Sequence, residues 1–224
     1  MSRSQKYLAV GAAVALVGAG AVLVTHQSRA ADHLDPPART DPANGGSDRN
    51  ADIADVFAWH VGSGATGKLV VAMSFSGPNP VAAGQKMPCD KDVLYTIHVQ
   101  PGAAGDPADE TKAHTAINVR MGADDLGNCF ATFEGLPGVT GSITIRAEAP
   151  IKVKGYDLFA GLRDDAFFFD LDGFKETLMT GAIKMINDRD FFAKKNTSVI
   201  VVEGDLPSGA EFKIWGTTGR AAAK

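Results

Sequence analysis

The stretch Val93-Leu-Tyr-Thr-Ile-His-Val-Gln100 alternates strictly between two sets of side chains. Successive side chains of an extended strand point to opposite faces. Val93, Tyr95, Ile97 and Val99 therefore share one face, while His98 lies on the other. An apolar face of this kind must be covered, so the stretch predicts a strand at the edge of a hydrophobic core.

The same alternation recurs on both sides of this stretch, with Gly, Pro and Asp between the runs. The runs cover residues 53–60, 68–76, 115–121, 130–133, 142–146, 198–203 and 211–216. Short strands at such regular spacing are typical of antiparallel all-β folds. The sequence predicts a mainly β protein, an antiparallel β-sandwich-like fold or a partly closed barrel.

One helix is predicted, near the C-terminal third of the chain. Asp172 is a suitable N-cap, and Phe174, Leu178, Ala182 and Met185 follow at helical spacing to about Ile186. We expect this helix to cover one end of the sheet.

The first thirty residues have the features of a secretory signal peptide. Arg3 and Lys6 precede an apolar run from Leu8 to Val24, and Ser28-Arg-Ala30 offers small residues before a cleavage site. Cleavage would leave Ala31 as the N-terminus. The alternative is an uncleaved anchor, because 17 apolar residues lie at the short end of what spans a bilayer.

The domain organisation follows from this division. Residues 1–30 are the signal peptide, residues 31–50 form an extended N-terminal arm rich in Pro, Asp and Gly, and residues 51–220 form a single β-rich domain. The basic tail from Gly219 to Lys224 is expected to fray. The predicted location is outside the cytoplasm, either periplasmic or extracellular.

The charge of the chain excludes one class of partner. The formal net charge is −4, and removal of residues 1–30 takes away Arg3, Lys6 and Arg29 but no acid, which gives −7. A nucleic-acid partner would call for a basic stripe, so none is expected. Membrane contact is expected only through an uncleaved signal segment.

Cys89 and Cys129 are the only cysteines, and both lie in the exported part. An oxidising compartment favours a disulfide between them. The alternative is that both cysteines are free buried thiols, and a less favoured alternative is that they bind a metal ion.

The most unusual segment is Gly161-Leu-Arg-Asp-Asp-Ala-Phe-Phe-Phe-Asp-Leu-Asp-Gly173, with four carboxylates around three phenylalanines. The rings call for cover on both faces, and charges at the rim of a core must be paired or must hold a cation. We call this segment the acidic block.

Calcium is the cation that the acidic block would suit, with Arg163 orienting the carboxylates. The candidate ligands are Asp164, Asp165, Asp170 and Asp172. An EF-hand is excluded, because Phe174 and Gly181 occupy its fifth and twelfth positions. The alternative is structural: Arg163 pairs with one or two of the aspartates, and Asp172 caps the helix.

Two further functions remain open. A pair of carboxylates from the acidic block could serve an extracytoplasmic hydrolase as acid and base. Cleavage after Ala30 would also give Ala31-Asp32-His33 a free amine, two amides and an imidazole, a set that suits Cu(II). His60, His98 and His114 show no ligand spacing and are interpreted as hydrogen-bonded or surface histidines.

Several motifs together resemble a known family. They are Asp52-Ile-Ala-Asp-Val-Phe57, Asp92-Val-Leu-Tyr-Thr-Ile-His98, the acidic block through Asp170, Asn196-Thr-Ser-Val-Ile-Val-Val-Glu203 and Ile214-Trp-Gly-Thr-Thr-Gly-Arg220. Their order and spacing from about His33 to Arg220 are similar to the bacterial domain of unknown function 4331. One departure is Ala166, where that family commonly has proline.

This resemblance implies an exported, mostly β domain and lends no activity. The sequence as a whole therefore favours an exported binding or structural module, with a divalent cation as its candidate ligand, over an enzyme.

Overall fold

The computed structural model describes residues 48–62, 67–103, 107–207 and 211–221. The described residues belong to one compact unit. The predicted signal peptide, the arm up to residue 47 and the copper candidate His33 lie outside the described residues.

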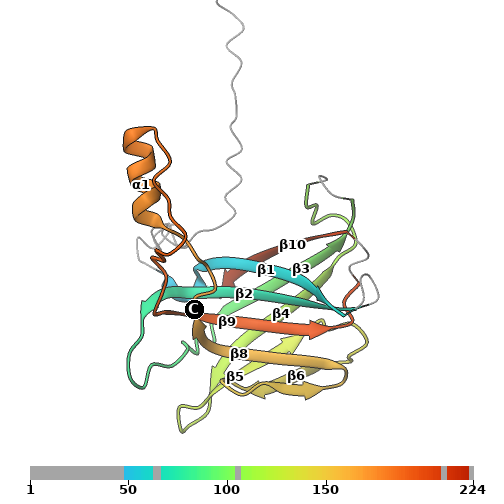
Figure 1. Ribbon diagram of the computed structural model, residues 1–224. Coiled ribbons are helices and arrows are strands. Elements are labelled where there is room, and N and C mark those ends of the chain that lie inside the picture. Colours follow the sequence, from blue (N-terminus) through green and yellow to red (C-terminus); the bar gives the residue numbers. More distant parts are fainter. Residues whose placement is uncertain (1–47, 63–66, 104–106, 208–210, 222–224) are drawn as a thin grey trace, which may run out of the picture. The chain divides into compact units, whose positions relative to one another are not determined.

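Ten strands form two five-stranded antiparallel sheets (Figure 1). The first, sheet A, has the order β1-β2-β9-β8-β7, and the second, sheet B, has the order β10-β3-β4-β5-β6. The bounds are β1 Ile53–Val61, β2 Lys68–Pro80, β3 Val93–Pro101, β4 Thr115–Ala123, β5 Cys129–Glu134, β6 Ser142–Arg146, β7 Ile151–Val153, β8 Tyr156–Asp164, β9 Lys195–Gly204 and β10 Phe212–Arg220.

The core lies between the two sheets. Val71, Met73 and Phe75 of β2 meet Tyr95 and Ile97 of β3, and all five are completely buried. His98 lies on the outer face, as the alternation predicted. Each sheet keeps its own edge strands, so the sheets do not close into a barrel. The sandwich-like fold is confirmed.

Sheet A also carries apolar side chains on its outer face. Val70 and Ala72 of β2 alternate with core residues, and Ala72 and Phe159 of β8 both pair with Val201 of β9 from opposite sides. Val70, Ala72 and Phe159 are buried, although they do not belong to the core cluster between the sheets. Strands of sheet A are therefore apolar on both faces.

The single α-helix of the described residues, α1, spans Leu171–Thr180. Asp170 caps its start by accepting a hydrogen bond from the Gly173 N–H, and Gly181 ends it in the left-handed conformation with φ +70°. The prediction of a helix capped by Asp172 and reaching Ile186 was wrong at both ends.

Helix α1 packs on neither sheet and projects from the sandwich (Figure 1). The expectation that it covers one end of a sheet was therefore wrong. Its chain returns through residues 181–192 and forms what we call the hairpin, residues 167–192.

The predicted disulfide is present between Cys89 and Cys129, whose Cα atoms lie 5.7 Å apart. It joins the segment before β3 to the first residue of β5. Within the described residues, no helix is long and apolar enough to cross a membrane.

Candidate functional site

The acidic block begins at the end of a strand and does not remain one. β8 ends at Asp164, which is exposed, and Phe167, Phe168 and Phe169 lie outside any strand. Phe168 is 56% exposed. The prediction that both faces of this segment are covered was therefore wrong, because the chain leaves the sheet at Asp164 to enter the hairpin.

Asp170 is the most firmly held carboxylate of the block. It is 5% exposed, and Arg189 donates to both of its oxygens at 2.8 Å. The Gly173 and Ile186 N–H groups donate to it at 2.9 and 3.0 Å. Arg189 and these amides lower the pKa of Asp170 to about 2 against the opposing effect of burial. Asp170 thus fastens α1 to the returning chain.

The other residues of the block lie apart from this pair. Asp165 is buried and accepts the Phe167 N–H at 3.0 Å, while Asp172 is exposed in the first turn of α1. Arg163 does not sit beside Asp170. Its guanidinium covers the Phe159 ring at 3.8 Å and lies 3.7 Å from the Glu148 carboxylate.

The described residues contain no group of three or more His, Cys, Asp or Glu that could hold a metal ion. Calcium binding at the acidic block stays a prediction, which thermal unfolding with calcium and with chelator tests. Two surface hollows of about 530 and 190 Å³ are lined by other segments, one around Tyr156 and Asp205 and one around Cys129 and Glu148.

The hairpin is where apolar side chains gather on the outside of the protein. The described residues include twelve large hydrophobic side chains that are exposed, and seven of them belong to the hairpin. These seven are Phe168, Phe174, Leu178, Met179, Ile183, Met185 and Ile186. Contiguous apolar surface on a soluble protein marks an interaction site.

The packing inside the hairpin explains this exposure. α1 turns its small and hydroxyl residues towards the returning chain: a methyl group at Gly173 would lie 2.7 Å from the Lys184 carbonyl oxygen, and Thr177 Oγ1 accepts the Lys184 N–H at 2.8 Å. Leu171 at the start of the helix is buried, but Phe174 and Leu178 lie on another side of the helix, four positions apart, and are exposed. The apolar side of α1 is therefore turned outward.

Aromatic rings pack against one another at the base of the hairpin, and Lys195 of β9 joins this base to sheet A: its N–H donates to the Phe192 carbonyl oxygen at 3.1 Å and its ammonium lies 3.2 Å from the centroid of the Phe191 ring. Phe167 lies 5.7 Å from Phe169 and 5.3 Å from Phe192 between ring centroids, and Phe169 lies 5.4 Å from Phe174. The Phe191 N–H donates to the Phe169 carbonyl oxygen at 3.0 Å. The hairpin is anchored at its base and free at its tip.

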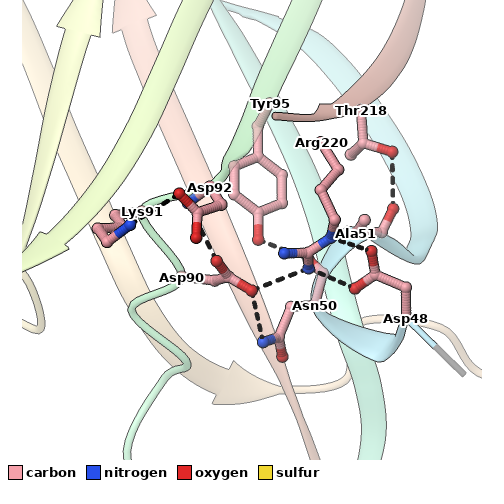
Figure 2. A network of polar contacts seen from close by, with 9 residues as sticks. All are labelled: Asp48, Asn50, Ala51, Asp90, Lys91, Asp92, Tyr95, Thr218 and Arg220. Carbon is pink, nitrogen blue, oxygen red and sulfur yellow. Dashed lines mark hydrogen bonds and ion pairs between the residues drawn. The ribbon is translucent and has the colours of Figure 1, made fainter. Parts of the chain in front are cut away.

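A second polar site joins the two ends of the described domain (Figure 2). Arg220 of β10 donates two hydrogen bonds to Asp48 at 2.5 and 2.6 Å and one to Asp90 at 2.9 Å. Asn50 donates to Asp90 at 3.1 Å, and its carbonyl oxygen accepts from the Tyr95 hydroxyl. Nε and Nη2 of the guanidinium both donate to protein carboxylates, so we interpret this network as structural.

The network changes two sequence interpretations. Asp48 and Asn50 belong to the predicted extended arm, but they lead into a short 3-10 helix, η3 (Arg49–Ala51), that β3 and β10 hold in place. Arg220 belongs to the tail that was expected to fray, and it is instead the centre of the network. Burial of Asp90 opposes its ionisation, but hydrogen bonds from Arg220 and Asn50 outweigh that effect and lower its pKa.

A third cluster lies on the outer face of sheet B. His98 Nδ1 is 3.1 Å from His114 Nε2, His98 Nε2 is 3.0 Å from the Thr217 hydroxyl, and His114 Nδ1 is 2.9 Å from the Lys112 carbonyl oxygen. The Trp215 ring stacks on His98 with the centroids 4.8 Å apart.

The hydrogen bonds fix the protons of this cluster in its neutral form. The Lys112 carbonyl can only accept, so His114 Nδ1 carries a proton and its Nε2 accepts from His98 Nδ1–H. His98 Nε2 then accepts from the Thr217 hydroxyl. Burial and the neighbouring His114 lower the pKa of His98 against the effect of Glu110. The interpretation of His98 and His114 as hydrogen-bonded histidines is confirmed.

Comparison with known proteins gives no assignment: no family model, no curated protein and no solved structure matches the chain. Membership of the domain of unknown function 4331 family stays a prediction.

Neither the role of Arg189 nor the pairing of His98 with His114 could be predicted, because nothing in the local sequence signals these contacts. A readable signal existed for the tip of the hairpin. Thr177-Leu-Met-Thr-Gly-Ala-Ile183 is an uncharged run between Glu176 and Lys184.

Proposed function

We propose that the protein is an exported binding module in which the β-sandwich carries the hairpin as its contact element. The observation behind this proposal is the gathering of exposed large apolar side chains on an element that packs on neither sheet. Leaving such side chains in water is unfavourable. A partner that covers them would recover this free energy.

The anchoring of the hairpin supports the same proposal. Asp170 and Arg189 fix the helix to the returning chain, and Lys195 of β9 holds the returning chain through the Phe192 carbonyl oxygen and the Phe191 ring. A contact element that is ordered before binding loses less entropy on binding than a flexible loop does. The acidic block thus supports binding indirectly: Asp170 holds α1 in position and does not itself contact the partner.

Export is part of this proposal. The disulfide between Cys89 and Cys129 is compatible with an oxidising compartment, and the predicted signal peptide would direct the chain there. Fractionation of the producing cells and N-terminal sequencing test this part. A chain that stays in the cytoplasm with an intact N-terminus would contradict it. Sequencing also decides whether the amine needed for copper binding at Ala31-Asp32-His33 exists.

Site-specific photo-crosslinking in the producing cells tests the contact element. A photoreactive residue replaces Ile183 at the tip, and the control replaces Leu126 in the β4–β5 loop, since both side chains are 86% exposed. We expect covalent adducts, with protein or with lipid, at position 183 and not at position 126. Equal labelling at both positions, or none at either, would count against the hairpin as a contact element.

A further inference from the structure

The tip of the hairpin differs from its base in exposure and in charge. Leu178, Met179 and Ile183 are 70%, 78% and 86% exposed, whereas Phe174 and Met185, nearer the base, are 38% and 45% exposed. The chain from Thr177 to Ile183 carries no charged side chain. We call this uncharged run, residues 177–183, the apex.

Several polar groups of the apex, among them both threonine hydroxyls, are satisfied within the hairpin. The Gly181 N–H donates to the Thr177 carbonyl oxygen, and the Thr177 hydroxyl donates to the Gly173 carbonyl oxygen at 2.7 Å. The Thr180 hydroxyl donates to the Glu176 carbonyl oxygen at 2.8 Å. Internal satisfaction of this kind is what an apolar medium requires of any segment that enters it.

The size of the apex argues against a protein partner. The three large apolar side chains of the apex each have an accessible surface of roughly 200 Å² when fully exposed. At their observed exposure they present on the order of 450 Å² of apolar surface together. A stable protein interface buries about 800 Å² on each partner. Phe174, nearer the base, lies about 6 Å from Leu178 along the helix. The apex alone therefore presents little more than half of the area that such an interface needs.

The charges that border the apex fit a lipid surface of low charge. Lys175 and Lys184 are exposed and border the apex, two residues before it and one residue after it, so their long side chains can reach headgroup phosphates. Glu176 lies at the same level, so these three residues carry a net charge of only +1. Attraction to anionic lipid is therefore weak, and insertion of the apolar side chains would drive binding.

We infer that the apex inserts into the headgroup and outer acyl region of a lipid bilayer, and that the sandwich stays in water. This inference rests on the proposed function and names its partner. The depth is that of an interfacial element, about 5–10 Å, because Lys175, Glu176 and Lys184 mark its limit. Helix α1 has only ten residues and does not span the bilayer.

Vesicle flotation tests the inference. The assay uses the chain from Ala31 onward, the proposed mature protein, whose described residues belong to one compact unit, and this removes the apolar run Leu8 to Val24. We expect it to float with pure phosphatidylcholine vesicles and to remain bound in high salt. The apex variant Leu178→Gln/Met179→Gln/Ile183→Gln should bind at least tenfold more weakly, while Leu126→Gln should bind as the wild type does.

Three results would overturn the inference. The first is a wild-type chain that does not float, or an apex variant that floats equally well. The second is binding that needs anionic lipid and is lost in high salt, which would assign contact to the lysines alone. The third is a wild-type dimer that the apex variant abolishes in sedimentation velocity runs without lipid, which would assign the apex to a second copy.

The two proposals fail separately. If photo-crosslinking at position 183 yields only protein adducts and the vesicles bind nothing, the hairpin remains the contact element and the lipid inference is wrong. If position 183 gives no adduct of any kind, the proposed function itself is wrong. Circular dichroism of the apex variant shows that it is folded, which its exposed positions lead us to expect.

Discussion

Arg220 shows how one side chain can hold together parts of the chain that are far apart in sequence. Its guanidinium binds Asp48 before β1 and Asp90 before β3, while the neighbouring Thr218 hydroxyl donates to the Ala51 carbonyl oxygen at 2.7 Å. A planar guanidinium can serve two carboxylates at once, which an ammonium group does less well. β10 is an edge strand, so these contacts secure it where hydrogen bonds to a second neighbouring strand are lacking.

We expect Arg220→Ala to lower the free energy of unfolding by about 2 kcal/mol, because it leaves two partly buried carboxylates without their shared donor. Arg220→Lys should lose part of that amount. Arg49→Ala, which removes one exposed hydrogen bond to Asn79, serves as the control and should change stability by less than about 0.5 kcal/mol. Urea denaturation measures all three. An Arg220→Ala protein as stable as the control would show that the network contributes little.

Contacts such as these mark the limit of what the sequence could reveal about single residues. Asp48 and Arg220 are 172 positions apart, and no local pattern announces their pairing. Asp170 was a predicted site residue, but its partner Arg189 was not. The sequence therefore suggested a metal cation as the partner of Asp170, whereas in the structure the Arg189 guanidinium binds it. The alternation around Tyr95 was reliable, because burial alone decides which face a strand turns inward.

At the level of elements, the sequence predicted eight of the ten strands and missed β7 and β8. β8 places Leu158 and Ala160 in the core, but Phe159 and Gly161, which alternate with them along the strand, are also buried. This breaks the alternation on which the prediction relied. The end of α1 was missed for a different reason. Apolar spacing was followed past Gly181, although glycine after the last turn is a common stop signal.

The hairpin is an accessory element, and its removal tests this. The Phe169 carbonyl oxygen and the Phe191 N–H are 3.0 Å apart, so an Asn-Gly turn can replace residues 170–190 without moving the sandwich. We expect the shortened protein to keep its β circular dichroism and to lose at most about 1 kcal/mol of stability, since α1 packs on neither sheet. Failure of the shortened chain to fold would make the hairpin part of the structural core.

The disulfide is the element-level contact with the largest expected effect on stability. Cys89 and Cys129 are 40 positions apart, and closing a loop of that size stabilises a fold by about 4 kcal/mol on the chain-entropy model. We expect Cys89→Ser/Cys129→Ser to lower the urea midpoint accordingly. Reductant should lower the midpoint of the wild type towards the same value and leave the double variant unchanged. A midpoint insensitive to both changes would contradict this role.

At the scale of the whole molecule, the hydrophobic core of the sandwich is separate from the polar clusters on its surface. The hydrophobic core is continuous between the sheets, and the titratable clusters lie outside it. The His98 and His114 pair joins β3, the start of β4 and β10, whereas Asp170 belongs to the hairpin. Protonation of His98 therefore affects the edge strand β10, and protonation of Asp170 separately affects the hairpin. The pH dependence of stability should reveal both.

We expect stability to fall in two steps as the pH is lowered. The pKa of folded His98 lies below its ordinary value of 6.5, so below that pH the unfolded chain binds more protons and stability decreases. Asp170 has a folded pKa of about 2 against 3.8 when unfolded, so its contribution is complete above about pH 4 and is lost towards pH 2.

Urea denaturation of the wild type and of His98→Gln across this range separates the steps. The variant should lose the upper step and keep the lower one, because Thr217 and His114 then face an amide that does not titrate. An upper step of equal size in both proteins would show that His98 is not its source.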